Sequence, residues 1–305
     1  VIDAAWASRH IGETVSVTLT VDDGVNAPLV QRIDVGAVGN VRGVGLNFSR
    51  QLDIPALPVG MQYTAVTGAN GFTVLLRSDG AVVTAGVRRT PFTIPPLPTG
   101  MTYTAVAAGY DTVVLLRSDG QVVATGDNEY GQLNIPPGTY TQISAGGGHV
   151  LALRADGTVV GAGTNLDGQL TIPAPPAGVV YTGVSAGDYH SVFLRSDGQA
   201  VSTDPLIEVP DLPDGVRYTQ VASGADGSVF LRSDGQAVLS DLGGIDMMPT
   251  LPDGVVYTAV AAGQGHVVLL RSDGTAIAVG SNRDGQRNIP TPVEGNRYTA
   301  IGAGY

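Results

Sequence analysis

A sequence unit of about 39 residues recurs through the chain and limits the folds open to it. The unit is clearest as YTAVAAGYDTVVLLRSDGQVVATGDNEYGQLNIPPG, residues 103–138. A Tyr-Thr pair begins each copy, at Tyr63, Tyr103, Tyr140, Tyr181, Tyr218, Tyr257 and Tyr298. An apolar residue followed by proline is a second, independent marker, at Ile54, Ile94, Ile135, Ile172, Val209, Met248 and Ile289. Both markers count seven units.

Within a unit, short apolar stretches alternate with turn sequences, so we predict four short strands. In the clearest unit these are residues 103–108, 113–117, 122–125 and 132–135. Ser-Asp-Gly between the second and third strands favours a hairpin, because Asp-Gly tolerates the positive φ angles of such turns. The proline after the fourth strand lacks the N–H of a ladder hydrogen bond and should end that strand. No glycine-free window shows the period of an amphipathic helix.

Seven units of four antiparallel strands predict an all-β fold, a seven-bladed β-propeller. The last copy stops after its first strand, and residues 30–55 align with the strands that it lacks: Gly45 falls on Gly126 and Asn47 on Asn128. We therefore predict one propeller domain, residues 30–305, with one blade closed by strands from both termini. Such closure leaves few exposed sheet edges.

Residues 1–29 are left over and are predicted to form an extra strand or linker. Val15, Val17, Leu19 and Val21 alternate with polar residues, as in a half-buried strand. This segment could lie on a blade edge or end a preceding module. A second possibility makes residues 17–24 the missing second strand and its turn, with an insertion of about 15 residues before the third strand.

Composition excludes several classes of function. All 16 basic residues are arginines against 27 acidic ones, a net charge of −11, so the chain lacks the basic stripe of a nucleic-acid-binding protein. Without cysteine there are no disulfides, thiolate nucleophiles or cysteine-ligated metals. No apolar run reaches the ~20 residues that span a bilayer. We expect no nucleic-acid partner and no membrane insertion. The first residues do not read as a signal peptide, although one could have been removed before residue 1.

The pattern A-A-G-x-x-H…L-R-S-D-G-x-V…G-x-N-x-x-G-Q resembles the regulator-of-chromosome-condensation repeat, whose family forms seven-bladed propellers. Residues 187–190 and 128–132 carry the match best. In repeat style the chain is similar to the secreted bacterial β-lactamase inhibitory propeller of this family, whose units also end in G-Q-x-x-x-P. One departure is the absence of the tryptophan usual before the third-strand glycine. The only tryptophan, Trp6, lies outside the ring, which argues against the light sensing of the family's plant ultraviolet receptors.

No residue pattern calls for catalysis, a metal or another cofactor. His149, His190 and His266 share one repeat position, but neighbouring blades hold that position too far apart for one metal at 2.0–2.1 Å. We expect them to be structural and to bond neighbouring loop backbone. Each Asp-Gly turn supplies one carboxylate, too few for a calcium cage, and should pair with the repeated arginine before it. There is no G-x-S-x-G sequence, so we expect no enzyme.

Strand direction predicts where a partner binds. The loops joining strands one to two and three to four should emerge on one face, and the Asp-Gly turns on the other. The first set varies between units, as binding loops on a repeated scaffold do. Its tyrosines and acids suit an interface core with a polar rim. The predicted binding residues are Phe48, Tyr110, Asp111, Glu129, Tyr130, Asp188, Tyr189 and Asp226.

We therefore predict a non-catalytic, monomeric scaffold that binds another protein through this face, outside a bacterial cell or on its surface. Two alternatives stay open. One is a secreted inhibitor of a hydrolase such as a β-lactamase, as the resemblance implies. The other is a carbohydrate-binding or glycan-active propeller with clustered carboxylates, of which Asp111, Asp188 and Asp226 are the candidates. A glycosidase would need two carboxyl groups roughly 5–9.5 Å apart.

Overall fold

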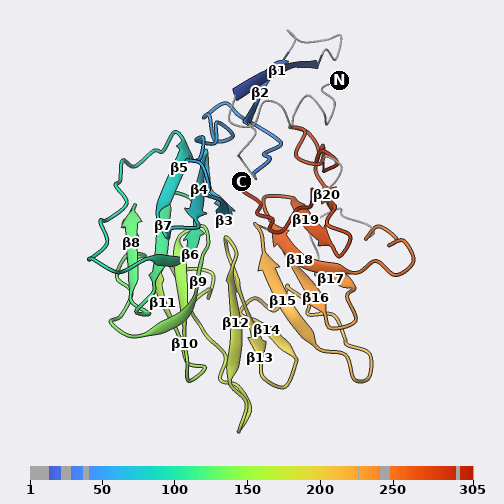
Figure 1. Cartoon of the computed structure of the whole chain (residues 1–305). Helices are drawn as coiled ribbons and strands as arrows, with labels where there is room; N and C mark the ends of the chain where they lie inside the picture. Colours follow the sequence, from blue (N-terminus) through green and yellow to red (C-terminus); the bar gives the residue numbers. More distant parts are fainter. Residues whose placement is uncertain are drawn as a thin grey trace.

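The computed structural model describes residues 14–21, 29–36, 41–225, 227–240, 248–292 and 296–304 (Figure 1). Every regular element in these residues is a β-strand. None of the described residues belongs to a helix of the length and apolarity that crossing a membrane requires. The all-β class predicted from the sequence is confirmed.

The strands form six three-stranded antiparallel sheets and one two-stranded sheet. The two-stranded sheet is β1 (Thr14–Val21) with β2 (Leu29–Gly36). The six larger sheets, in chain order, are β3 (Tyr63–Gly68), β4 (Phe72–Arg77) and β5 (Val82–Gly86); β6 (Tyr103–Ala108), β7 (Thr112–Arg117) and β8 (Val122–Gly126); β9 (Tyr140–Ala145), β10 (His149–Arg154) and β11 (Val159–Gly163); β12 (Tyr181–Ala186), β13 (Ser191–Arg195) and β14 (Ala200–Ser202); β15 (Tyr218–Ser223), β16 (Ser228–Arg232) and β17 (Ala237–Leu239); β18 (Tyr257–Ala262), β19 (His266–Arg271) and β20 (Ala276–Gly280).

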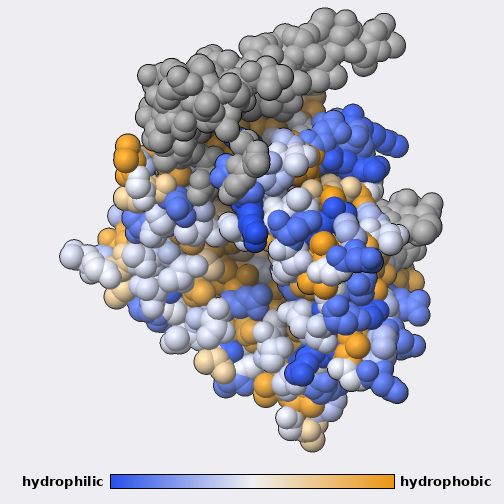
Figure 2. All heavy atoms as spheres, turned by 45° about the vertical axis from the view of Figure 1, so that its right-hand side comes forward, coloured by the Kyte–Doolittle hydropathy of each residue, from blue (hydrophilic) through white to orange (hydrophobic). Residues whose placement is uncertain are grey.

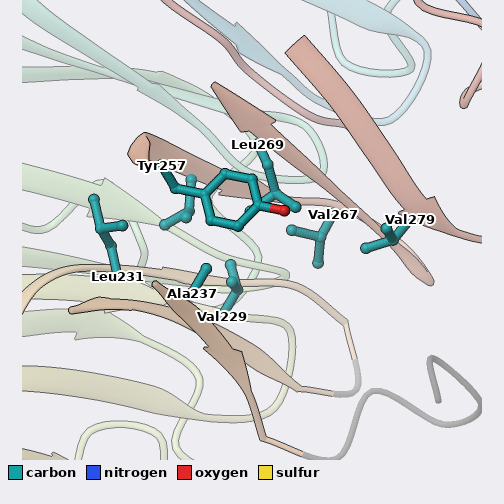
Figure 3. Packing of buried hydrophobic residues seen from close by; sticks show 8 residues of the cluster. Val229, Leu231, Ala237, Tyr257, Val267, Leu269 and Val279 are labelled. Carbon is teal, nitrogen blue, oxygen red and sulfur yellow. The ribbon is translucent and has the colours of Figure 1, made fainter. Parts of the chain in front are cut away.

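The middle strand of each sheet is apolar on both faces, and the second to fifth sheets each pack between two others. In β7, residues 112–116 are all buried and only Arg117 is partly exposed. Five hydrophobic clusters fill the five interfaces between consecutive sheets. Figure 3 shows the cluster between the fifth and sixth sheets, where Tyr257 and Leu269 meet Val229 and Leu231. On the outside, hydrophobic residues are scattered among hydrophilic ones, as Figure 2 shows for one side of the molecule.

The first strand of each sheet lies innermost, and glycines at its end let the sheets meet around the axis (Figure 1). A methyl group on Gly146 would lie 1.9 Å from the carbonyl oxygen of Gly187, and one on Gly263 would lie 2.2 Å from that of Gly304. A methyl group on Gly68 would in turn lie 2.6 Å from Cα of Gly304. The two ends of the ring therefore touch, as they do in a closed β-propeller.

The prediction of seven blades with four strands is wrong on both counts in the described residues, which form six sheets of three strands. The predicted fourth strand at residues 132–135 is a chain of turns. Its N–H groups are used locally: Leu133 donates to Asn128 Oδ1 at 2.8 Å and Asn134 to the Gly131 carbonyl at 3.0 Å. A segment whose donors are satisfied in this way has none left for a ladder.

Between the sixth and first sheets lie residues 41–55 and 298–304, and these described residues form no sheet. The predicted alignment of Asn47 with Asn128 agrees with the local hydrogen bonds. Asn47 Oδ1 accepts a hydrogen bond from the N–H of Leu52 at 2.7 Å, as Asn128 Oδ1 does from the N–H of Leu133. The Tyr298 hydroxyl donates to the Pro290 carbonyl at 2.8 Å, as Tyr257 does to Pro249. The strand predicted within residues 1–29 exists as β1, but it pairs with β2 and not with a blade edge.

Candidate functional site

The loops that follow the first and third strands of each sheet emerge together, as predicted, and we call this side the loop face. Within a sheet the two loops are hydrogen-bonded to each other. The Asp127 N–H donates to the Asp111 carbonyl at 2.9 Å, and the Thr164 N–H donates to that of Gly148 at 2.9 Å. In the sixth sheet the Ser281 N–H donates to the Gly265 carbonyl at 2.8 Å. Backbone hydrogen bonds thus hold the two loops of a sheet together on the loop face.

The opposite face carries the Asp-Gly turns, whose polar groups serve the turns themselves. Asp119 Oδ1 accepts the Gln121 N–H at 3.1 Å, and its Oδ2 lies 2.5 Å from the Arg117 guanidinium. The predicted arginine–aspartate pairs form in four turns, Arg77–Asp79, Arg117–Asp119, Arg195–Asp197 and Arg232–Asp234. The Arg195 guanidinium holds the pKa of the Asp197 carboxyl below its usual range. These acids are structural.

Tyr110 and Asp188, both predicted as binding residues, are bonded to each other. The Tyr110 hydroxyl donates to Asp188 Oδ2 at 3.0 Å, which joins the second sheet to the fourth. The Tyr110 ring passes over Gly147 of the third sheet. A methyl group added to Gly147 would lie 3.1 Å from the Tyr110 ring. Asp188 is only 3% exposed. This pair braces the loop face, so Tyr110 is not the free aromatic anchor that the sequence suggested.

Large apolar side chains at the loop tips of the second, third and fourth sheets are strongly exposed. Their exposed fractions are 53% for Tyr130, 86% for Leu166, 54% for Tyr189 and 81% for Leu206. Tyr130 leans toward the next sheet, where a methyl group on Gly148 would lie 3.4 Å from its ring. We call these four residues the apolar arc. Asp127, Glu129, Asp167 and Asp204 adjoin it in the same loops, and Asp111 lies in the neighbouring loop between β6 and β7.

A small cavity of about 350 Å³ opens beside the arc. Its charged lining residues are Arg89, Asp111 and Asp127, and the Arg89 N–H donates to Asp111 Oδ1 at 3.3 Å. Tyr110 and Tyr130 form its aromatic wall. Within the described ranges, no three histidines or acids are grouped so as to hold a metal ion.

The remaining predicted residues divide by position. Phe48 is 85% exposed, but it precedes the first sheet and lies outside the arc. Glu129 is exposed beside Tyr130. Asp226 lies outside the described residues, so its prediction is not tested. Asp188 is buried beneath Tyr110, an arrangement that does not favour the glycan-active alternative.

The prediction omitted Leu166 and Leu206, although each carries a sequence signal. Leu166 follows the repeated asparagine directly, the position of Phe48, Glu129 and Arg283 in other units. Leu206 lies where the fourth unit departs from the N-x-x-G-Q pattern. A large apolar residue at a loop tip of a repeat has no packing role, which makes it a candidate for binding.

The repeated histidines are buried, and the expectation that they bond loop backbone is wrong for His149, whose Nδ1 has no hydrogen-bond partner. His149 Nε2 lies 2.9 Å from Ser191 Oγ, and His190 Nε2 lies 2.9 Å from Ser228 Oγ. Each bond therefore joins one sheet to a hydroxyl of the next. Burial lowers the pKa of His149 to about 4, and the neighbouring His190 adds to the effect.

Comparison with known proteins agrees with this architecture. The family model described as regulator of chromosome condensation (RCC1) repeat matches residues 103–132, 140–169 and 257–286. No curated protein matches the chain by sequence.

Among solved structures, human WBSCR16 is 18% identical with a TM-score of 0.67, covering 81% of this chain and 86% of that one. Prp20p from Saccharomyces cerevisiae, described with its binding properties to Gsp1p and histones, is 19% identical with a TM-score of 0.61, covering 78% and 77%. The ectodomain of the Physcomitrella patens receptor kinase CR4 is 20% identical with a TM-score of 0.61, covering 78% of this chain. The match spans 66% of that ectodomain, just under two thirds of its length.

The solved structures share the fold of this chain, and the family model matches three of its units. The chain is accordingly a β-propeller by fold, and residues 103–132, 140–169 and 257–286 are similar to the regulator-of-chromosome-condensation repeat.

Proposed function

We propose that this propeller is a non-catalytic scaffold that binds another protein through its loop face. The observation that carries the proposal is the apolar arc, Tyr130, Leu166, Tyr189 and Leu206, each more than half exposed on three consecutive sheets. Apolar side chains of this size that gather on one exposed surface are typical of protein interaction sites. The similar Prp20p is described with protein partners, which is consistent with such a role.

The charges around the arc indicate the chemistry of the partner. Five acidic residues adjoin the arc, and the chain as a whole carries a net charge of −11. A partner with apolar side chains at the centre of its surface and arginine or lysine around them would be complementary. Such charges accelerate association, and salt screens them over roughly 8–10 Å at physiological ionic strength. We therefore propose a basic protein surface as the partner.

The opposite face supplies a matched control. Val59 is 90% exposed there, in a connection between units, and the corresponding residues of other connections are Thr99, Ala177, Asp214 and Asp253. A single exposed valine without apolar neighbours of its own kind is ordinary on a protein surface. Substituting it changes exposed apolar area without touching the arc.

Affinity capture followed by mass spectrometry tests the proposal. The wild-type chain, the double variant Tyr130→Ser/Leu166→Ser and the control Val59→Ser are immobilised and exposed to the source's extract and to its culture medium. We expect a basic protein that the wild type and the control retain and that the arc variant binds at least about 30-fold more weakly. Equal retention by all three, or loss with Val59→Ser alone, would move the interaction surface away from the arc. Capture from the medium would support the secreted-inhibitor alternative.

A further inference from the structure

The charged side chains of the loop face are divided between two sides of the ring. The acidic ones lie in loops of the second, third and fourth sheets, together with the apolar arc: Asp111, Asp127, Glu129, Asp167 and Asp204. No arginine occurs in the loops that carry them. We call these acidic residues, with the apolar arc, the acidic side of the loop face.

Arginines lie across the ring from the third sheet, on loops of the first and sixth sheets and on the segment between them (Figure 1). Arg89 follows β5, and Arg283 follows β20. Arg50 lies next to the loop after β5, where the Val87 N–H donates to the Ser49 carbonyl at 2.8 Å. The three arginines are exposed, and within the described residues none of them forms an ion pair. They outnumber the acidic Asp284 of the same loops.

Two large apolar side chains lie among these arginines. Phe48 is 85% exposed and Val87 is 63% exposed. Arg88, in contrast, is held within its own loop, because its guanidinium lies 4.5 Å from the centre of the Phe92 ring and donates to the Phe92 carbonyl at 3.3 Å. The basic side of the loop face is accordingly Phe48, Arg50, Val87, Arg89 and Arg283.

The backbone of Arg50 indicates that this side has a role in binding. Arg50 has a φ of +59°, and no other described residue except glycine has a positive φ. The same repeat position holds Gly131, Gly168 and Gly285, whose φ angles are +79°, +83° and +79°. A residue with a Cβ atom is disfavoured in this conformation, and residues kept in it cluster at functional sites. Local folding favours glycine here, whereas the chain has an exposed, charged side chain.

We propose that the loop face binds a second copy of this chain, with the acidic side of each copy against the basic side of the other. The inference rests on the binding role proposed above for the apolar arc. The partner inferred there has apolar side chains at the centre of its surface and basic residues around them. Phe48 and Val87 with Arg50, Arg89 and Arg283 have this composition. A dimer departs from the monomer expected from the sequence.

The arrangement of the two sides suits a symmetric dimer. In a two-fold symmetric interface every contact between two different residues occurs twice, so the surface must be complementary to itself. The acidic and basic sides lie across the ring from each other (Figure 1). A two-fold axis that lies in the plane of the loop face and runs between the two sides therefore places the acidic side of each copy on the basic side of the other.

Sedimentation velocity of the full chain tests whether the dimer exists. We expect a dimer whose fraction increases with concentration in the micromolar range. Its fraction should decrease between about 0.1 M and about 1 M salt, over which the screening length falls from roughly 10 Å to 3 Å. A chain that stays monomeric throughout this range at the lower salt concentration would overturn the proposal.

Charge reversal followed by mixing tests which sides meet. Arg50→Glu/Arg283→Glu makes the basic side acidic, and Glu129→Arg/Asp167→Arg makes the acidic side more basic. Each variant alone should dimerise at least about tenfold more weakly than the wild type, because like charges then face each other in both copies of the contact. An equimolar mixture should form a heterodimer, because opposite charges face each other again. Failure of the mixture to recover would contradict the pairing of the two sides.

The matched control changes the net charge by the same amount on the opposite face. Arg217 and Arg297 are exposed there, beside Gly198 and Gly274 of two Asp-Gly turns. Arg217→Glu/Arg297→Glu should dimerise as the wild type does. Equal weakening by this control and by Arg50→Glu/Arg283→Glu would show that net charge, and not the loop face, governs association.

Arg50→Gly separates binding from folding. Glycine is favoured at a positive φ, so this variant should keep or raise the Tm of the wild type. It should also weaken the dimer at least about threefold, because each dimer loses two arginines from its interface. A lower Tm with an unchanged dimer would make Arg50 a residue of the fold alone and would contradict its role in binding.

Failure of the dimer and failure of the proposed function give different results. Tyr130→Ser/Leu166→Ser should weaken the dimer as well as the capture of a basic protein, because both use the apolar arc. A chain that is monomeric but captures a basic protein through the arc would refute the second copy and keep the proposed function. A dimer that persists unchanged in this variant would lie on another surface and would refute the arrangement proposed here.

Discussion

At the scale of single residues, buried titratable groups make stability depend on pH in a direction that the structure fixes. His149 is 1% exposed, and burial lowers its pKa to about 4 from 6.5. Between these values the unfolded chain binds a proton that the folded chain does not, so stability is present above pH 6.5 and is lost as pH falls toward 4. We expect His149 to contribute at most about 3 kcal/mol to this loss.

Urea unfolding at pH 7 and pH 5 measures the effect. His149→Thr is the matched variant, because Thr112 occupies this position in the second unit. It should show a smaller difference between the two pH values than the wild type. Burial also lowers the pKa of His266, so some dependence should remain. A His149 imidazole that titrates near pH 6.5 by NMR would contradict the argument.

A second residue-scale prediction concerns high pH. Burial raises the pKa of the Tyr218 hydroxyl to about 12, with Arg232 opposing and nearby Asp211 adding to the shift. Because the folded chain keeps a proton that the unfolded chain loses near pH 10, this stabilisation is complete below pH 10 and disappears as pH rises through 12. Absorbance titration of tyrosinate should show ionisation above pH 10 that coincides with unfolding. Tyr218→Phe, which loses the hydrogen bond to Pro210, should be about 1 kcal/mol less stable at pH 7 but less sensitive to alkali.

At the scale of elements, the ends of the innermost strands depend on glycine. A methyl group on Gly146 would lie 1.9 Å from the Gly187 carbonyl oxygen, a backbone atom that can move only if two sheets separate. We expect Gly146→Ala to reduce the free energy of unfolding by about 3 kcal/mol. Gly138→Ala is the control, since its nearest neighbours, at 3.2 Å, are the side chains of Arg154 and Tyr140. It should cost less than about 1 kcal/mol. Equal losses in chemical denaturation would show that contact between these strand ends does not limit stability.

At the scale of the whole molecule, closure depends on the last residues described. Gly304 touches Gly68 of the first sheet, and its carbonyl accepts the Gln264 N–H from the sixth. Removing residues 296–305 should therefore open the ring and lower Tm by about 10 °C or more, since backbone hydrogen bonds and packing contacts are lost together. Removing residues 1–13 should leave Tm within a few degrees. Differential scanning calorimetry on the two truncations decides this, and similar Tm values for both would contradict closure through Gly304.

The sequence by itself determined the repeat, the bounds of the first three strands of the clearest unit to within one residue, and the side on which the variable loops lie. The prediction for residues 103–108 agrees with β6, and that for residues 122–125 agrees with β8 to within one residue. Local sequence was enough to predict these strands, because apolar stretches and Asp-Gly turns determine the conformation of residues close to them in the chain. The same reasoning failed at residues 132–135, which were predicted as a strand. There the N–H groups of Leu133 and Asn134 donate to the Asn128 side chain and the Gly131 carbonyl instead of to a neighbouring strand.

Only the tertiary structure decided which loop residues are available to a partner and how the ring ends meet. Tyr110 and Tyr130 look equivalent in the sequence, yet Tyr110 crosses Gly147 to Asp188, a residue 78 positions away, while Tyr130 is 53% exposed. The bond between Tyr110 and Asp188 depends on the curvature of the ring, which brings three sheets together around the axis. That residues 41–55 and 298–304 form no sheet between the sixth and first sheets also became visible only in three dimensions, because their sequence aligns with that of a complete blade.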